Sequence, residues 1–303
     1  EGLKLNEYGL FRGTRRLAGR SEQDVYQALG LPYVPPELRE DRGEIEAARA
    51  GRLPRLIEYG ALRGDLQIQT EWTDGAASIE AMALAAKAIG LEYIAITDHT
   101  RDLAMAHGSD EARLLEQAGT IRKLNRTLRG FRVFSGAEVN IREDGSLDVA
   151  DESYLHDQML DRKALAQLDV VGAAIHTKFR LSRTQMTRRV LRAMENPHVD
   201  ILFHPTARLI GRREPVALDV DAVIAVAKRT GTVLEIDAMP DRLDLRDEYV
   251  RKAVSAGVAL AIDSDAHQPG HLAYADEFGV AVARRGWARA ADVVNTLSAG
   301  GCL

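Results

Sequence analysis

The stretch GDLQIQTEWTDGAASIEAMALAAKAIGLEYIAITDH, residues 64–99, contains two apolar runs separated by a helical pattern. The runs, residues 64–70 and 91–99, are short and contain β-branched residues, which is typical of buried strands. Between them, Ser78 is a suitable helix N-cap and Gly90 a suitable stop. The stretch therefore predicts a strand, a helix and a second strand parallel to the first.

The same alternation continues along the chain. Five more apolar runs follow, each separated from the next by a longer interval, at residues 132–141, 169–176, 199–205, 232–238 and 258–267. Near-continuous apolar strands between helices indicate a parallel sheet that is covered on both faces. Seven such units over about 240 residues favour a closed (β/α)7 barrel over an open doubly wound sheet. No G-x-G-x-x-G turn and no P-loop follows a predicted strand, so nothing supports the open alternative.

The first 63 residues have a different character. They contain one predicted short strand and then a helix with Ser21 as its N-cap. A segment rich in proline and charge follows, which predicts a linker with short helices over residues 21–63. The α/β barrel is then expected to occupy residues 64–303. The sequence has no apolar run of about 18 residues and no secretory pattern, so no membrane span or signal peptide is expected.

Charge and cysteine content narrow the class of protein. A net charge of −5 and a pI near 6.0 argue against a strongly basic nucleic-acid-binding protein. The single cysteine, Cys302, excludes an internal disulfide, fits a reducing cytoplasm and is not expected to be catalytic. Of the 40 basic residues 33 are arginine, which suits phosphate binding. Two arginine clusters occur: Arg180, Arg183, Arg188, Arg189 and Arg192, and then Arg208, Arg212 and Arg213. The first fits a solvated helix face equally well, whereas the second follows a candidate site residue and is predicted to contact phosphate or DNA.

Residues that bind metals or move protons stand where the predicted strands end. In chain order they are Gln67 and Gln69, Asp98 and His99, Glu138, His176, His204, Glu235 and Asp237, and Asp263, Asp265 and His267. Strand carboxyl ends converge on one rim of a βα-barrel. Imidazole together with carboxylate predicts a site for Zn²⁺, Mn²⁺ or Fe²⁺ rather than for Ca²⁺ or Mg²⁺. Such a cluster suits phosphoryl chemistry, and Glu138 is placed to bridge two ions.

Other residues have more ordinary interpretations. A nucleophilic serine is not expected, because there is no G-x-S-x-G motif and Ser264 lies between two acids. Asp98 is expected to orient His99 from behind, and Glu235 and Asp237 to hold loops at the rim. The remaining histidines lie in helical or loop stretches and are expected to have no metal role; they are His107, His156, His198 and His271.

Several motifs resemble the polymerase-and-histidinol-phosphatase (PHP) domain, and more narrowly the one at the C-terminus of bacterial family X DNA polymerases. They are ITDHT, SGAEVNI, VVGAAIH, DILFHPTARLIGRREP, LEIDAMPDRLDL and LAIDSDAH. LKLNEYGLF, within residues 1–20, resembles the end of that polymerase's thumb, and YQALGLPYVPPELREDRGEIEAA resembles its linker. The resemblance implies a distorted seven-stranded barrel, a role in DNA repair, and DNA and the parent's N-terminal polymerase domains as partners.

The resemblance also implies up to three divalent ions, manganese or zinc, and 3′–5′ exonuclease activity, with 3′-phosphatase or abasic-site cleavage in some members. By position, the first ion would be held by Asp74, His99 and His267. The second would be held by Glu138, His176 and His204. Glu138 and Asp265 would share the third with two residues of the opening strand. His99, Glu138, Asp265 and His267 would be the catalytic residues.

The chain departs from the family's His-x-His motif, because Gln67 and Gln69 stand at those positions. They alternate with Leu66 and Ile68, so both amides are expected on one face of the strand. An amide oxygen is a weak ligand for Zn²⁺ or Mn²⁺, so the third ion is expected to be lost or weakly bound.

Three hypotheses about function follow. The chain is an active or attenuated two-metal phosphodiesterase on DNA 3′ ends, or a degenerate PHP domain that serves as a structural or DNA-binding arm. A small-molecule phosphatase is the third, and the linker argues against it. Polymerase chemistry is not predicted in these residues, since no Gly-Ser turn with a paired-aspartate strand precedes residue 64.

Overall fold

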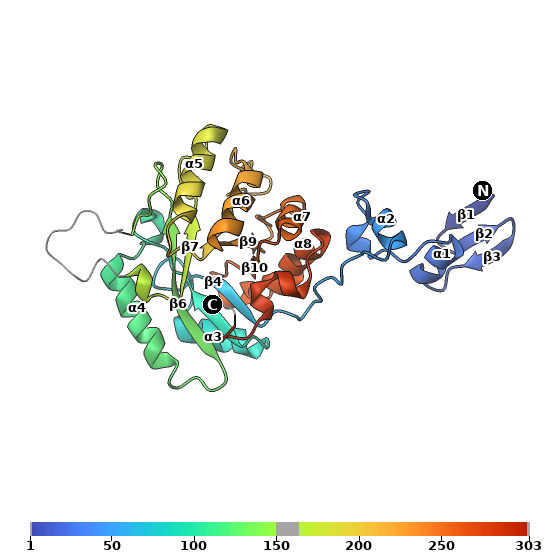
Figure 1. Cartoon of the computed structure of the whole chain (residues 1–303). Helices are drawn as coiled ribbons and strands as arrows, with labels where there is room; N and C mark the ends of the chain where they lie inside the picture. The colour runs from blue at the N-terminus through green and yellow to red at the C-terminus, as the bar shows by residue number, and fades with distance from the viewer. Residues whose placement is uncertain (1, 150–163, 302–303) are drawn as a thin grey trace. The chain divides into compact units, whose positions relative to one another are not determined.

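The computed structural model describes residues 2–149 and 164–301. The chain divides into two compact units, Glu1–Arg55 and Leu56–Leu303 (Figure 1). This division falls inside the segment predicted as a linker, and the finer boundaries after residues 20 and 63 stay predictions.

The first unit begins with a three-stranded antiparallel sheet in the order β1-β2-β3. Its strands are β1 (Leu3–Asn6), β2 (Gly9–Arg12) and β3 (Arg15–Ala18). The prediction of one short strand was therefore wrong. The two connecting turns, Glu7-Tyr8 and Gly13-Thr14, lack the Asn-Gly or Asp-Gly pair that marks a hairpin most strongly.

Short helices complete the first unit. They are α1 (Glu22–Ala28), the 3₁₀ turn η1 (Pro36–Leu38) and α2 (Glu44–Arg49). Ser21 caps α1 as predicted, because its Oγ accepts a hydrogen bond from Asp24 N at 3.2 Å.

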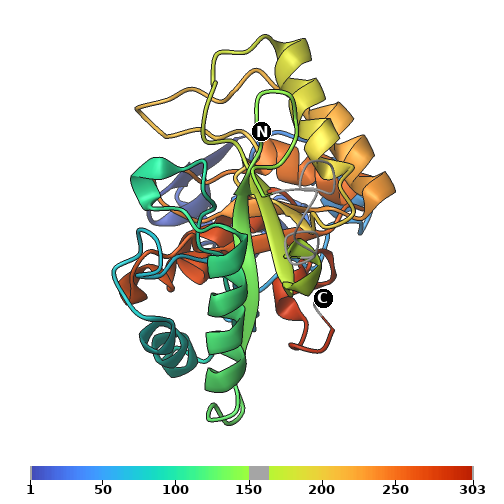
Figure 2. The same ribbon diagram turned by 90° about the vertical axis from the view of Figure 1, so that its left-hand side faces the viewer.

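The second unit contains seven parallel strands in the order β10-β9-β8-β7-β6-β5-β4. Their bounds are β4 Gly64–Ile68, β5 Tyr93–Ile96, β6 Arg132–Asn140, β7 Val170–Ala174, β8 Ile201–Leu202, β9 Val233–Asp237 and β10 Leu260–Asp263. A parallel bridge joins Ile68 at the end of β4 to Ala266 after β10, so the two edges of the sheet meet. The sheet nearly closes into the predicted distorted seven-stranded α/β barrel (Figures 1 and 2).

Helices follow most of the strands and cover the outside of the sheet (Figure 1). They are α3 (Ile79–Ala88), α4 (Glu111–Leu124), α5 (Arg183–Met194), α6 (Val220–Thr230), α7 (Asp247–Ala256) and α8 (Val280–Arg285), with shorter 3₁₀ and π turns between them. Figure 2 shows α4 lying along β6. Ser78 begins α3 as predicted, since its Oγ accepts a hydrogen bond from Ala81 N at 3.2 Å.

Aromatic side chains from the strands pack within a buried cluster. The rings of Tyr93 and Phe134 meet edge to face with centroids 5.6 Å apart. Gly172 on β7 leaves room for the ring of Phe203, because a Cβ at this position would lie 1.8 Å from a ring carbon. The cluster joins residues of β4, β5, β6, β7, β8 and β10 in one buried core.

Candidate metal centre at the strand ends

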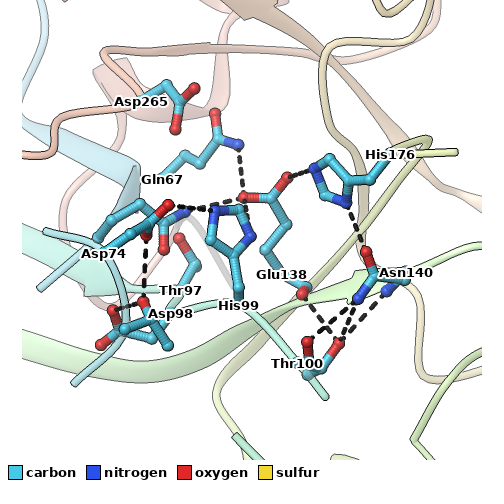
Figure 3. Close-up of polar contacts among 12 residues, drawn as sticks. Gln67, Asp74, Thr97, Asp98, His99, Thr100, Glu138, Asn140, His176 and Asp265 are labelled. Atoms are coloured by element: carbon cyan, nitrogen blue, oxygen red, sulfur yellow. Dashed lines mark hydrogen bonds and ion pairs between the residues drawn. The ribbon is translucent and has the colours of Figure 1, made fainter. Parts of the chain in front are cut away.

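Glu138 is the centre of the polar cluster at the strand ends. It lies on β6 and is fully buried. Its Oε1 is 3.0 Å from Nε2 of His176, which follows β7 (Figure 3). The same oxygen is 2.8 Å from Nε2 of His204, which follows β8. Its Oε2 is 3.5 Å from Nδ1 of His99, which follows β5. Three neighbouring strands thus direct imidazoles at one carboxylate.

The surroundings of Glu138 keep it ionised. Burial alone would raise its pKa, because a charged carboxylate loses solvation in the interior. The neighbouring imidazoles of His99 and His176, with hydrogen bonds from His176 and His204, outweigh burial and hold the pKa of Glu138 well below its usual range. The buried residue is therefore an anionic ligand at neutral pH.

A second group of ligand atoms adjoins the first. Asp74, in the loop after β4, has its Oδ2 3.5 Å from His99 Nε2 and 3.8 Å from His267 Nε2. Figure 3 shows the His99 ring between Asp74 and Glu138. One group consists of Asp74, His99 and His267, and the other of His99, Glu138 and His176. Within each group the ligand atoms lie within 4.8 Å of one another.

These donor sets fit divalent transition metals. Imidazole with carboxylate is the ligand chemistry of zinc, manganese and iron. Buried ring nitrogens also lack hydrogen-bond partners, namely Nδ1 of His99 and Nδ1 of His204. An unpaired buried polar atom is costly, and an ion bound by Nδ1 of His99 would account for that atom. Nδ1 of His204 is the ring nitrogen that is not directed at Glu138, so an ion held through Nε2 leaves it unexplained. The structure brings together the six predicted ligands of two ions, and their role in holding ions stays a prediction.

The third predicted position has different chemistry. Gln67 Nε2 and Gln69 Nε2 donate hydrogen bonds to Glu138 Oε2 at 3.2 and 2.8 Å, so the two amides do face the same side. Their oxygens, the only amide atoms that bind metals, are buried without a partner. Beside them, Oδ2 of Asp265 lies 3.7 Å from Nε of Arg242. Oε2 of Glu138 is thus bonded to amide N–H groups and Oδ2 of Asp265 is paired with a guanidinium, whereas Oδ1 of Asp265 has no hydrogen-bond partner among the described residues. The ligand atoms left at this position are two neutral amide oxygens and one carboxylate oxygen, and the loss or weak binding of a third ion stays a prediction.

A buried hydrogen-bond chain orients His176. Asn140 Oδ1 lies 2.6 Å from His176 Nδ1 (Figure 3). Asn140 Nδ2 donates to Asp148 Oδ2 at 2.7 Å. Asp148 also accepts a hydrogen bond from Thr100 Oγ1 at 2.7 Å. Sequence reasoning missed Asn140. Its position two residues after Glu138 on one strand was the available signal, because alternate residues share a face.

Asp98 does not orient His99, so that prediction was wrong. Its carboxylate accepts hydrogen bonds from Thr70 N at 2.7 Å, Thr73 Oγ1 at 2.6 Å and Gln117 Nε2 at 2.6 Å. Adjacent residues of an extended segment point in opposite directions, which explains why Asp98 turns away from the His99 ring. Asp98 instead fixes the loop that carries Asp74.

Glu235 and Asp237 contact backbone near the rim. Glu235 Oε2 accepts a hydrogen bond from His204 N at 2.5 Å, and Asp237 Oδ1 accepts one from Met239 N at 2.8 Å. Both side chains are fully buried. These contacts support the view that the two acids hold the loops after β8 and β9.

The arginines of the second cluster differ in exposure. Arg208 Nε donates to Arg242 O at 2.6 Å, and Arg213 Nε donates to Ala207 O at 2.7 Å. The side chain of Arg212 is 76% exposed. Arg212 is therefore largely exposed, with its Nη1 3.8 Å from Asp241 Oδ2, and phosphate binding by the cluster stays a prediction.

Arg189, from the first cluster, is not on a solvated helix face. It is 1% exposed, and its guanidinium donates to the backbone oxygens of Ile141, Arg142 and Thr177. These carbonyls belong to the segments that follow Asn140 and His176. Charge in the sequence indicated exposure here, but the buried carbonyls provide partners that only the fold reveals.

The remaining histidines lie outside both ligand groups, as far as the described residues show. His107 is exposed, His198 is half-buried, and the His271 ring stacks on Tyr274 with centroids 5.3 Å apart. His156 and Cys302 lie outside the described residues. Within the described ranges, the structure contains no helix with the length and apolar character needed to span a bilayer.

The chain is similar in sequence to known proteins. Residues 1–40 match the family model of the DNA polymerase beta thumb. Over 98% of its length the chain is 41% identical to the Bacillus subtilis DNA polymerase/3′-5′ exonuclease PolX, and it spans 50% of the length of that protein. It is also 28% identical to a probable phosphatase of Acetivibrio thermocellus, over 63% of this chain and 73% of that protein.

A solved structure shares the barrel fold. Histidinol phosphate phosphatase from Lactococcus lactis, solved with zinc, L-histidinol and phosphate, superposes with a TM-score of 0.52 at 12% identity. The match covers 75% of this chain and 95% of that one. At this identity the likeness shows the fold alone.

Proposed function

This chain belongs to the family X DNA polymerases of bacteria and carries their PHP region, and on that premise we propose that it is a metal-dependent phosphoesterase that removes nucleotides from DNA 3′ ends. The observation that carries the proposal is the buried Glu138 with His176, His204 and His99 directed at its two oxygens. The printed name of the Bacillus subtilis relative, which includes 3′-5′ exonuclease, supports the direction of cleavage.

Two divalent ions, Mn²⁺ in the first instance, would occupy the centre. Asp74, His99 and His267 would hold one, and Glu138, His176 and His204 the other. Such ions polarise a phosphoryl oxygen and lower the pKa of a water molecule.

The chain's own residues set the geometry of these ligands. Glu138 stays ionised in the interior, which keeps an anionic oxygen available between the imidazoles. Asn140 holds the His176 ring, and Asp98 fixes the loop that carries Asp74. Outer partners of this kind fix the orientation and tautomer of a ligand.

A DNA strand has a basic approach to the centre. Lys178, Arg180 and Arg212 line a groove of about 800 Å³ that also includes Phe179. The groove includes Lys178, two residues after His176 in the chain, and on that ground we place the DNA path here. Phosphate contacts by such cations are sequence-independent and weaken as salt rises. The thumb match of residues 1–40 supports a further proposal, that polymerase domains of the same parent protein act with this chain on DNA.

One observation favours a second candidate function. Gln67 and Gln69 donate hydrogen bonds to Glu138 Oε2, so this carboxylate oxygen has partners without an ion. A chain that bound metal poorly would then serve as a structural or DNA-binding arm.

The test measures metal content and cleavage on the same preparation. The chain is expected to retain two Mn²⁺ per molecule and to shorten a 5′-labelled strand with a recessed 3′ end, whereas Glu138→Ala does neither. Fewer than one bound ion per molecule, together with no cleavage, would contradict the proposal and favour the structural or DNA-binding arm. Turnover of histidinol phosphate without cleavage of DNA would instead indicate a small-molecule phosphatase.

Changing Lys178, Arg180 and Arg212 together to glutamine tests whether this groove binds DNA. The proposed groove predicts weaker DNA binding with a shallower salt dependence. Unchanged affinity would exclude this groove as the DNA path.

A further inference from the structure

The third position of the centre holds a cation that belongs to the protein. Arg242, in the loop after β9, places its Nε 3.2 Å from Asp237 Oδ2 and 3.7 Å from Asp265 Oδ2. Its side chain is 19% exposed, against 5% or less for the two carboxylates. The guanidinium therefore pairs with Asp265, the residue predicted to bind the third ion.

The loop of Arg242 is fixed by bonds to its backbone. Arg208 donates to the carbonyl oxygens of Arg242 and Leu243. Asp237 and Asp244 exchange backbone hydrogen bonds of 2.6 and 3.1 Å, which close the loop at its base. Arg208, predicted to bind phosphate, thus positions a second arginine nearer to the centre.

Charge explains why an arginine lies here. Three carboxylates, Glu138, Asp237 and Asp265, approach one another in the interior, and buried charges require compensation. An arginine side chain stays protonated in proteins, so this guanidinium supplies the compensating positive charge. An ion between Asp265 and Glu138 would lie beside this guanidinium, and like charges at such distances repel strongly.

We propose that the Arg242 guanidinium takes the place of the third ion and contacts the phosphate of the DNA substrate. The inference rests on the proposed phosphoesterase function. Both ion pairs of the guanidinium use Nε, and its Nη groups make no hydrogen bond within the described part of the chain, so the Nη N–H donors remain for a ligand. A planar arginine fork binds phosphate oxygens in pairs, and a fixed positive charge stabilises the charge that develops in phosphoryl transfer.

Metal counting tests the exclusion of the third ion. The wild-type chain and Gln67→His/Gln69→His are both expected to retain two Mn²⁺ after desalting. Adding Arg242→Met to the histidine pair is expected to raise the count to three. Three ions in the histidine pair alone, or two in the triple variant, would overturn the inference. Fewer than two ions in the wild-type chain would speak against the proposed function instead.

Binding of inorganic phosphate to the Mn²⁺-loaded chain tests the contact. Arg242→Met is expected to lower the affinity for phosphate about tenfold or more, which is the effect of losing one charge-assisted pair. Arg242→Lys should lose less, because it keeps the charge without the fork.

Two controls keep this test decisive. Arg229→Met, which removes an exposed arginine bonded to Glu195 on the outer surface, should leave phosphate affinity unchanged. Thermal unfolding identifies any variant that fails to fold. If Arg242→Met fails to fold, phosphate affinity is compared between the wild-type chain and Arg242→Lys. Unchanged phosphate affinity in a folded Arg242→Met chain with two ions would overturn the contact.

Discussion

Replacement of Asn140 by alanine is expected to weaken the binding of one of the two ions and to leave the binding of the other unchanged. Asn140 Oδ1 holds Nδ1 of His176 at 2.6 Å, so that Nε2 is the ring atom directed at Glu138. A histidine that binds metal through one nitrogen depends on the hydrogen bond at the other to fix its tautomer and ring angle. Alanine removes that bond but leaves the ligands Asp74, His99 and His267 unchanged.

The size of the effect follows from these contacts. Loss of an outer-shell partner typically lowers metal affinity by about 10–100-fold, or about 1.4–2.7 kcal/mol. The variant also loses the bond from Nδ2 to Asp148 at 2.7 Å, in a site where Asn140 is 6% exposed and Asp148 1%. Unsatisfied buried partners cost about 1–3 kcal/mol of folding stability.

Calorimetric titration of Mn²⁺ into the metal-free chain measures the affinity of each of the two sites. Urea unfolding measures the free energy of unfolding. Asn125→Ala is the matched control, because Asn125 exchanges two hydrogen bonds with the backbone of Val133, at 2.7 and 2.9 Å, near the end of α4. The control should lose stability and keep both affinities. Equal metal affinity in Asn140→Ala and wild type, or equal weakening in both variants, would refute the reasoning.

Three further changes test the fold and its buried charges. Gly172→Ala places a Cβ 1.8 Å from a ring carbon of Phe203 and should cost about 1–3 kcal/mol in urea unfolding; an unchanged midpoint would contradict the packing. Arg189→Met leaves three backbone carbonyls without their donor and should cost about 3 kcal/mol by the same assay, whereas a loss under about 0.5 kcal/mol would show that those bonds are weak. Burial raises the pKa of Asp263 to about 6, so the folded chain retains a proton that the unfolded chain loses, and stability from this group falls as pH rises from about 4 to 6. In metal-free protein Asp263→Asn should therefore matter little at pH 4 and stabilise by up to about 3 kcal/mol at pH 8, and destabilisation at pH 8 would contradict that sign.

The barrel was predictable because its strands are buried on both faces. Each of the seven apolar runs contains one strand, from β4 at Gly64–Ile68 to β10 at Leu260–Asp263. Parallel strands read as continuous apolar runs, and helices between them leave few other arrangements. The hairpins of the first unit were missed because their pairing depends on turns that carry no strong local signal.

The centre was predictable only where it depends on strand ends. Topology alone brings His99, Glu138 and His176 to one rim. The positions of Arg208 and Arg242 depend on the path of loops and on backbone carbonyls, which local patterns do not reveal. A charged side chain in a sequence indicates exposure on average, and a buried arginine becomes evident only when the fold supplies its partners.

The central claim is that the rim at the carboxyl ends of the barrel strands binds two divalent ions and excludes a third. Anomalous X-ray scattering from crystals soaked in Mn²⁺ tests it most directly. We expect one peak among Asp74, His99 and His267, a second among Glu138, His176 and His204, and none between Gln67 and Asp265. A map without a peak at His99 or Glu138, or with a third peak against Asp265, would contradict the account.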